Sequence, residues 1–417
     1  MDVEGAVAGA KGRVPLGVCF EQAAEIVLGR LQHAVSSLLR AGPEQPRKAA
    51  DVERVFGLDH RLGWQIYRIA HATNALSAGP YVPARVSMMK LLTVAGRKGV
   101  SQEVIAELSE AYDEFEGLIR EHATDRAEFD AMVRAFLPEE RAKQDLESRE
   151  GAVKMMSQVK GVAMEAAIDA SFLHPSADGK RVDRASLVCN LGLRRTRPNA
   201  RIEYWTAEFG GRDNSSLTLG GVPIDDPRSM LLPQFCTQPT PRFDVSTSEG
   251  MTSYLVAGEE IGLSSAIDLV VASQMPAGMK RYREPGGRRT AGVFFTTDTP
   301  LKRGTLDVFI HRDVYPGSQP ELAVYDIVPR GVVRSFDDQT RQRDRIDVHE
   351  TVRSLGRVGV NARLPHMPRY LELLEHVYST LGWKPDDFRG YRLDVMFPVY
   401  GAQYLVGFEM PELPTGG

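Results

Sequence analysis

Residues 48–72 read KAADVERVFGLDHRLGWQIYRIAHA, and this stretch decides the architecture of the N-terminal part of the chain. Apolar residues recur at helical spacing on both sides of Gly57, which predicts two short amphipathic helices that turn sharply against each other at this glycine. The apolar sides of the two helices are formed by Val52, Val55 and Phe56 and by Leu62, Ile66 and Ile69.

This pair of segments resembles the helix-turn-helix of DNA-binding regulators, whose second helix enters the major groove. Gly57, Leu58 and Ile66 match that pattern. Two positions depart from it, because Glu53 stands where a small residue is common and Gly63 where a branched apolar residue packs the two helices together. The resemblance implies double-stranded DNA as the partner. It also implies that Arg61, Gln65 and Arg68 face the groove and that His60 and Lys48 lie near phosphates.

The charge around this motif is unevenly distributed along the chain. Residues 40–98 contain ten basic and four acidic residues, whereas residues 101–150 contain six basic and fifteen acidic ones. Because phosphate contacts supply most non-specific affinity for DNA, a basic island is the footprint expected of a DNA-binding surface. The acidic stretch is expected to face away from DNA. The alternative is that the two helices simply form the core of a helical bundle.

The chain is 417 residues long, which favours two or three domains over one. Its composition, 42% apolar and 25% charged, is typical of a soluble globular protein. We find no apolar run long enough to span a membrane and no secretory signal at the N-terminus. The three cysteines, Cys19, Cys189 and Cys236, have neither disulfide nor metal-ligand spacing, so we expect a cytoplasmic protein.

The sequence predicts an α+β multidomain fold. Residues 1–16 are expected to form a flexible tail, and residues 17–137 an all-α domain that contains the helix-turn-helix. Residues 138–175 are expected to form a long linker or dimerisation helix, with a stripe of mostly small residues from Met156 to Ala170 that includes Val159, Ala163 and Ala166. Residues 176–417 are expected to form a mostly antiparallel β domain with a late helix from Pro368 to Gly382.

Within the β domain, three pairs of strand-like runs flank turn-rich sequences, and we expect antiparallel strands, with the first and the last pair forming hairpins. The runs are rich in Val, Ile, Phe and Tyr and are separated by polar turns; in the last pair, apolar residues alternate with others along each strand. The pairs are 187–193 with 202–206, 306–312 with 322–328, and 391–397 with 404–410.

Catalytic motifs are absent from the sequence. It contains no Walker phosphate loop, no strand-linked GxGxxG, no HExxH and no GxSxG, and the His311-Arg-Asp313 tripeptide lacks the asparagine of a kinase catalytic loop. His311, His349 and His366 are an alternative acid–base or metal cluster if the fold brings them together. Two basic loops, around residues 194–201 and 280–289, are either phosphate contacts or solvated turn charge. We therefore predict no catalytic residue, metal or cofactor.

Three functional hypotheses follow. The leading one is a DNA-binding transcriptional regulator that acts as a homodimer, with a C-terminal sensor or assembly domain for an unknown small-molecule effector. The second is an enzyme or small-molecule-binding protein with its site in the β-rich domain. The third is a structural protein that self-assembles through the segment 139–172.

Overall fold

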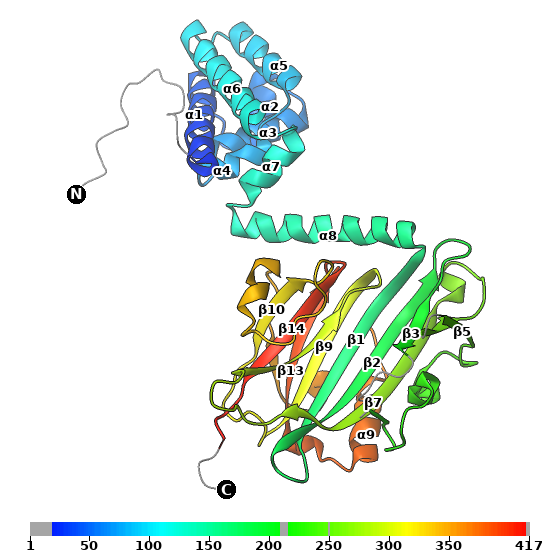
Figure 1. Ribbon diagram of the computed structural model, residues 1–417. Coiled ribbons are helices and arrows are strands. Elements are labelled where there is room, and N and C mark those ends of the chain that lie inside the picture. The colour runs from blue at the N-terminus through cyan, green and yellow to red at the C-terminus, as the bar shows by residue number, and fades with distance from the viewer. Residues whose placement is uncertain (1–18, 209–215, 249–250, 414–417) are drawn as a thin grey trace. The chain divides into compact units, whose positions relative to one another are not determined.

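A computed structural model describes residues 19–208, 216–248 and 251–413 of the chain. Internal contacts divide it into two compact units, Met1–Asp145 and Leu146–Gly417, and each is described by itself (Figure 1). The tail predicted for residues 1–16 lies outside the described residues. No helix in the described ranges combines the length and the apolar character needed to cross a bilayer.

The first unit is all-helical. Its N-terminal caps are polar in several places; the Asp59 side chain, for example, accepts a hydrogen bond from the backbone N–H of Leu62, 3.0 Å away. The helices are α1 (Phe20–Ala41), α2 (Ala49–Phe56), α3 (His60–Ala70), α4 (Ala75–Ala78), α5 (Arg85–Arg97), α6 (Gln102–His122) and α7 (Arg126–Arg134), with a 3-10 turn η1 (Gly79–Tyr81) after α4.

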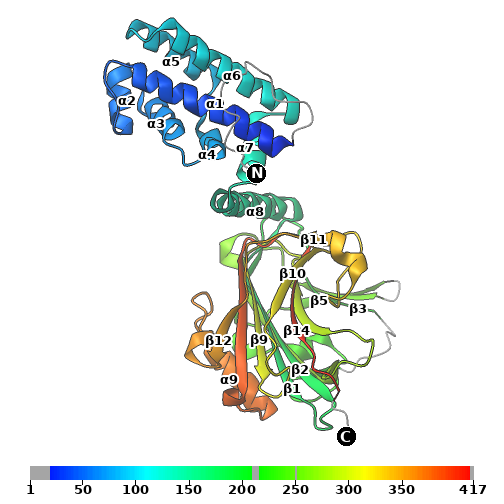
Figure 2. The same ribbon diagram turned by 90° about the vertical axis from the view of Figure 1, so that its left-hand side faces the viewer.

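Helix α1 is the centre of this unit. It contacts α6 on one side and α3 and α4 on the other, and Figure 2 shows α5 and α6 on the side of α1 opposite α2, α3 and α4. One continuous core joins these layers; Leu31, Phe56 and Phe115 are completely buried in it. The two helices predicted around Gly57 are therefore present, and their apolar sides belong to this core.

Helix α8 (Pro138–Lys160) crosses the boundary between the two units. The prediction of a helix through residue 172 was wrong, because α8 ends at Lys160 and the strand β1 (Val162–Pro175) follows. Gly161 separates them with a φ of +74°, a conformation that ends the helix. Ala163, Ala166 and Ala170 are strand residues. The spacing of the alanines suggested a helix. In the strand, every second residue from Met164 to Phe172 is apolar, which is the period of a β-strand.

The second unit is an α+β fold built from three sheets. The strand orders are β12-β13-β9-β1-β2-β7-β4, β11-β10-β14-β8 and β3-β6-β5, and β1 and β9 are parallel while the other ladders are antiparallel. The remaining elements are β2 (Arg181–Arg195), β3 (Glu203–Glu208), β4 (Leu217–Thr218), β5 (Phe243–Ser248), β6 (Met251–Val256), β7 (Ile267–Lys280), β8 (Thr290–Thr296), β9 (Leu301–His311), β10 (Glu321–Asp326), β11 (Arg345–Ile346), β12 (Arg353–Arg357), β13 (Phe388–Met396), β14 (Ala402–Glu409) and α9 (Tyr370–Leu381).

The seven-stranded sheet is covered differently on its two faces. Helix α9, which begins and ends close to the predicted Pro368 and Gly382, packs on one face with Leu373 and Val377 against Ile168 and Phe172. The four-stranded sheet packs on the other face, over β9 and β13 (Figure 2). The predicted late helix is thus confirmed. It has a single apolar side because only that side packs against the sheet.

A buried ion pair joins three of these elements. The guanidinium of Arg392 on β13 donates two hydrogen bonds of 2.6 Å to the carboxylate of Asp307 on β9, and both side chains are completely buried. The hydroxyl of Tyr370 on α9 donates to the same carboxylate at 2.7 Å. Arg392 also donates to the backbone carbonyls of residues 362 and 363, so its charge is fully hydrogen-bonded inside the core.

Neither of the two predicted hairpins forms, and the remaining pair of runs does not pair either. The strands exist, but β2 and β3 lie in different sheets, and the same holds for β9 and β10 and for β13 and β14. Alternation along a strand reports which face of a sheet is buried and carries no information about the neighbouring strand. Each turn-rich segment therefore connects two layers rather than two neighbours.

Candidate nucleic-acid interface

The turn between α2 and α3 depends on Gly57, which has a φ of +62° and ends α2 in the left-handed conformation. The two departures from the helix-turn-helix pattern are in contact with each other. A Cβ built on Gly63 of α3 would overlap the Cγ of Glu53 on α2 and would lie 3.2 Å from its backbone nitrogen. The larger residue on the first helix thus occupies the space that the missing side chain on the second leaves open, and α3 packs closely on α2.

The Glu53 side chain also reaches the start of α3. Its carboxylate lies 2.8 Å from Nδ1 of His60, whose ring is otherwise largely exposed. The backbone hydrogen bond from Leu62, and after it the contact with Lys90, lowers the pKa of Asp59 at the N-cap. An ionised carboxylate there fixes the first turn of α3.

The structure places the five predicted contact residues on the surface of this helix pair. Lys48, His60, Arg61 and Arg68 are exposed, and Gln65 is half-buried. Because α3 turns once every 3.6 residues, Arg61, Gln65 and Arg68 lie on one side of it. Lys48 immediately precedes α2 and His60 is the first residue of α3, so both lie at the starts of the two helices.

Trp64 belongs to the same side of α3 and was not predicted as a contact residue. It is 43% exposed, and its ring meets that of Tyr81 edge to face at a centroid distance of 5.3 Å. The guanidinium of Arg68 lies 4.6 Å from the Tyr81 ring and donates a 2.7 Å hydrogen bond to the hydroxyl of Tyr81. The four-residue spacing of Trp64 and Arg68 indicates that both lie on one side of α3, whereas it carries no information about Tyr81, which belongs to η1.

The charge of this surface is not cancelled locally. Several basic residues nearby pair with carboxylates, such as Arg54 with Glu44 at 2.6 Å and Lys90 with Asp59 at 3.0 Å. Among the residues that the structure describes, Lys48, Arg61 and Arg68 form no ion pair, whereas Arg54, Arg85 and Lys90 do. The exposed side of α3 is therefore a positive surface with an aromatic side chain at its centre.

The acidic stretch of the sequence is placed elsewhere in the unit. Much of it forms α6, and α1 lies between α6 and α3 (Figure 2). Two of the carboxylates, Asp113 and Glu116, pair with Arg85 on α5, and Glu114 pairs with Arg30 on α1 at 2.9 Å. The negative charge of α6 thus lies on the opposite side of α1 from the positive surface of α3.

The histidines of the second unit do not form one cluster. His311 ends β9, whereas burial and the nearby charge of Arg303, at the other end of that strand, lower the pKa of His366. His311 instead faces His174 at a ring distance of 4.9 Å, and burial together with His174 lowers the pKa of His311. No group of three potential metal ligands occurs in the described ranges.

In the two basic loops of the second unit, several arginines form hydrogen bonds or ion pairs with other residues of the same unit. Arg194 pairs with Glu165 at 2.7 Å, and Arg195 donates to the backbone carbonyls of Ala200 and Val256. Arg281 donates to the carbonyls of residues 179 and 313 at 2.9 and 3.0 Å. These guanidinium groups hold loops against strands.

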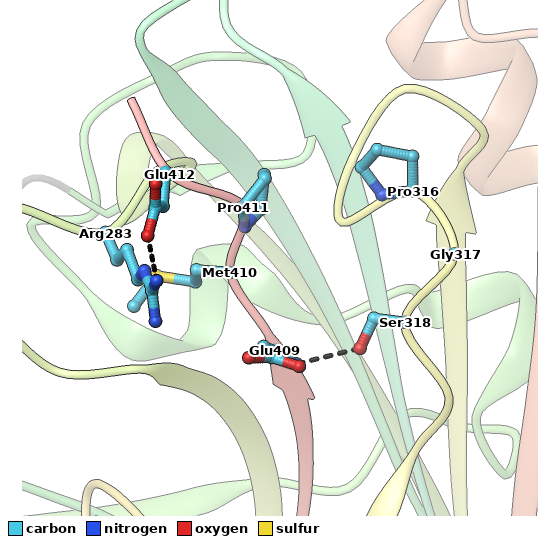
Figure 3. Close-up of a pocket in the computed structure, with 8 residues that line it drawn as sticks. All are labelled: Arg283, Pro316, Gly317, Ser318, Glu409, Met410, Pro411 and Glu412. Carbon is cyan, nitrogen blue, oxygen red and sulfur yellow. Dashed lines mark hydrogen bonds and ion pairs between the residues drawn. The ribbon is translucent and has the colours of Figure 1, made fainter. Parts of the chain in front are cut away.

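A depression with a volume of about 440 Å³ lies near the C-terminal end of β14 (Figure 3). Arg283 in its wall is paired with Glu412, and the hydroxyl of Ser318 accepts a hydrogen bond from the backbone N–H of Glu409. These polar groups already satisfy one another, so the depression offers little to a ligand. It is lined by Arg283, Pro316, Gly317, Ser318, Glu409, Met410, Pro411 and Glu412.

Comparison with known proteins adds little. No family model matches the chain, and no curated protein matches it in sequence. Solved structures with some likeness include a proposed protease from Parabacteroides distasonis ATCC 8503, at 9% identity and a TM-score of 0.26, matching 60% of this chain and 41% of that one. Another is an M1 zinc metallopeptidase from Deinococcus radiodurans, at 8% identity and a TM-score of 0.24, matching 59% and 42%. The chain thus spans about two fifths of either protein, and likenesses this weak carry no argument.

Proposed function

We propose that the protein is a DNA-binding transcriptional regulator whose helix α3 enters the major groove of double-stranded DNA. One observation carries the proposal: Arg61, Trp64 and Arg68 lie on one exposed side of a helix that follows a glycine turn, and neither arginine is neutralised by a carboxylate among the described residues. Such a surface fits the negative charge and the width of the groove.

Each side chain on α3 would contact a different part of the DNA. Arg61 and Gln65 have the donors and acceptors that read guanine and adenine edges. Trp64 would make an apolar contact with a thymine methyl group. Arg68, whose orientation is fixed by its hydrogen bond to Tyr81, would make a charged contact with the DNA. Lys48 and His60 would bind phosphates from the starts of the two helices.

A dimer fits this mode of binding, because helix-turn-helix proteins usually bind two half-sites. Met155 and Val159 on α8 are 69% and 64% exposed and lie four residues apart, so they form an apolar strip suited to a second copy of the chain. We further propose that the protein acts in the cytoplasm and that the second unit serves as its sensor or assembly domain.

The proposal is tested by charge reversal on α3. Arg61→Glu with Arg68→Glu is expected to weaken binding to a pool of genomic DNA fragments at least about a hundredfold, because two phosphate or base contacts become repulsive. Fluorescence anisotropy at several salt concentrations would measure this loss, together with a decrease of about two in the slope of log affinity against log salt.

The matched control is Arg97→Glu with Lys98→Glu, which makes the same charge change at two exposed positions at the end of α5. This variant is expected to bind DNA nearly as well as the unmodified protein. Equal loss in the two variants would show that only net charge matters, and the assignment of α3 would then be wrong.

A further inference from the structure

A polar strip crosses the centre of the seven-stranded sheet in the second unit, on the face opposite α9. Side chains alternate along each strand, so the residues of β1 that face away from Ile168 and Phe172 point to this other side. The strand register places Ser171 opposite Ser186, and Ser186 opposite Ser273. The strip consists of Asp169 and Ser171 on β1, Arg184, Ser186 and Asn190 on β2, and Ser273 on β7.

The composition of this face changes across the sheet. Over β9 and β13, the same face is mostly apolar, with Leu306, Val308 and Leu393 buried under the four-stranded sheet and Arg389 near the start of β13. Over β1, β2 and β7, polar residues share this face with Val188 and Val271, and the strip residues are half-buried apart from Ser171, which is 3% exposed. A sheet centre that needed only to be covered would use apolar residues, so the polar strip calls for another explanation.

The two charges in the strip are not paired with each other. Nη2 of Arg184 donates to the hydroxyl of Ser171 at 3.2 Å, while its Nε is buried and has no hydrogen-bond partner in the described part of the chain. Asp169 lies on the same face of β1, two residues before Ser171. It forms no ion pair within 4.0 Å among the described residues. A buried guanidinium with one unsatisfied N–H, beside a carboxylate that forms no ion pair, is costly for a protein, and a bound molecule that completes both would remove that cost.

The surroundings of Asp169 fit a binding position. Burial raises the pKa of its carboxyl to about 7, against the opposing attraction of Arg184, and Asp298 is the other charged group that acts on it. By accessible area the residue Asp169 as a whole is half-buried. A charged partner placed next to it would recover the electrostatic energy that burial costs.

We propose that this strip binds a small zwitterionic ligand of the α-amino-acid type. The ligand carboxylate would accept hydrogen bonds from Nε and the guanidinium nitrogens of Arg184, and its ammonium group would donate to Asp169. The hydroxyls of Ser186 and Ser273 and the amide of Asn190 lie beside these two positions to orient it. A simple anion would leave Asp169 unpaired and a simple cation would leave Arg184 unpaired, so a molecule with both charges fits best.

The proposal stands independently of DNA binding, and a direct titration tests it. The full-length protein is titrated by calorimetry with the free L-α-amino acids at millimolar concentration, and thermal unfolding is followed in parallel, because a ligand of the native state raises the Tm. The strongest binder is then compared with its N-acetyl and C-amide forms, each of which lacks one charge. Both blocked forms are expected to bind at least about tenfold more weakly, since each loses a charge-assisted contact.

Variants assign the contacts to residues. Arg184→Met and Asp169→Asn are each expected to weaken binding at least about tenfold, whereas Arg181→Met, at an exposed position on the same strand, is expected to leave it unchanged. The comparison of blocked ligands needs no variant, so it decides the matter even if a variant fails to fold. The proposal is overturned if no amino acid binds, or if the blocked forms bind as well as the free one.

Discussion

At the scale of single residues, the contact between Glu53 and Gly63 shows what a motif comparison misses. Each residue departs from the helix-turn-helix pattern, and the missing side chain at Gly63 leaves the space that the larger Glu53 side chain fills. A pattern scores positions one at a time, so it counts two mismatches where the folded chain contains one compensated pair. The exposed positions Arg61 and Arg68 could be predicted from helical spacing alone, whereas the contribution of Tyr81 could not, because it comes from a separate turn.

Gly63→Ala is expected to destabilise the helical unit by about 1–3 kcal/mol, because the new methyl group overlaps the Glu53 side chain and crowds its backbone. Adding Glu53→Ala should recover part of that loss. Urea unfolding would measure both. Gly117→Ala is the control, since a Cβ there meets only an arginine tip at 3.9 Å, and it should be neutral or slightly stabilising. Equal stability of the Gly63 and Gly117 variants would contradict the close contact.

The raised pKa of Asp169 has a consequence for stability against pH. The folded protein holds this proton up to a pH of about 7, whereas the unfolded chain releases it near the ordinary value of 3.8. The free energy of unfolding therefore decreases as pH rises through this window. Relative to Asp169→Asn, the unmodified protein should lose on the order of 1–2 kcal/mol between about pH 5 and pH 8. Urea titrations at several pH values would check this; parallel curves for the two proteins would contradict it.

At the scale of elements, the ends of helices could be predicted better than the partners of strands. Gly57 and Gly382 end α2 and α9 as the sequence indicates, because a left-handed residue at a helix end is a local requirement. The partner of a strand depends on residues far away along the chain. The segment after Gly161 was mistaken for helix because alanine is a strong helix former, and burial between two cores outweighed that local preference.

The ion pair of Asp307 and Arg392 holds β9, β13 and α9 together. Asp307→Asn leaves a buried guanidinium without its counter-charge, and we expect the second unit to lose about 3–5 kcal/mol of stability. Asp394→Asn breaks a pair with Arg303 that is partly exposed, and it should cost only about 1 kcal/mol. Chemical unfolding would compare the two variants. A similar cost for both would show that burial of the first pair is not what matters.

At the scale of the whole molecule, the chain contains separate hydrophobic cores for its two units. The core of the helical unit comprises residues between 20 and 137, and the cores of the second unit comprise residues between 162 and 410. A separate core is the physical basis of a separate cooperative transition. Length and the change of periodicity predict two such bodies, whereas the position of the boundary inside α8 was not predicted.

Differential scanning calorimetry is expected to resolve two unfolding transitions in the full chain. Gly63→Ala should lower the temperature of one, and Asp307→Asn that of the other, by several degrees each. The matched substitutions Gly117→Ala and Asp394→Asn should move either transition much less. A single transition that both destabilising variants shift together would mean that the two units unfold as one.

The parallel pairing of β1 with β9 determines when the second unit can form during synthesis. Met164 pairs with Leu301 and Leu173 with Ile310, so β1, which can pair with β2 at once, leaves the ribosome long before its other neighbour, β9, exists. The helical unit, whose contacts are local, can fold as soon as it emerges. For much of translation the chain therefore carries a finished helical unit followed by a partial sheet whose β1 edge lacks β9, and chaperone binding during that interval should favour residues 162–300.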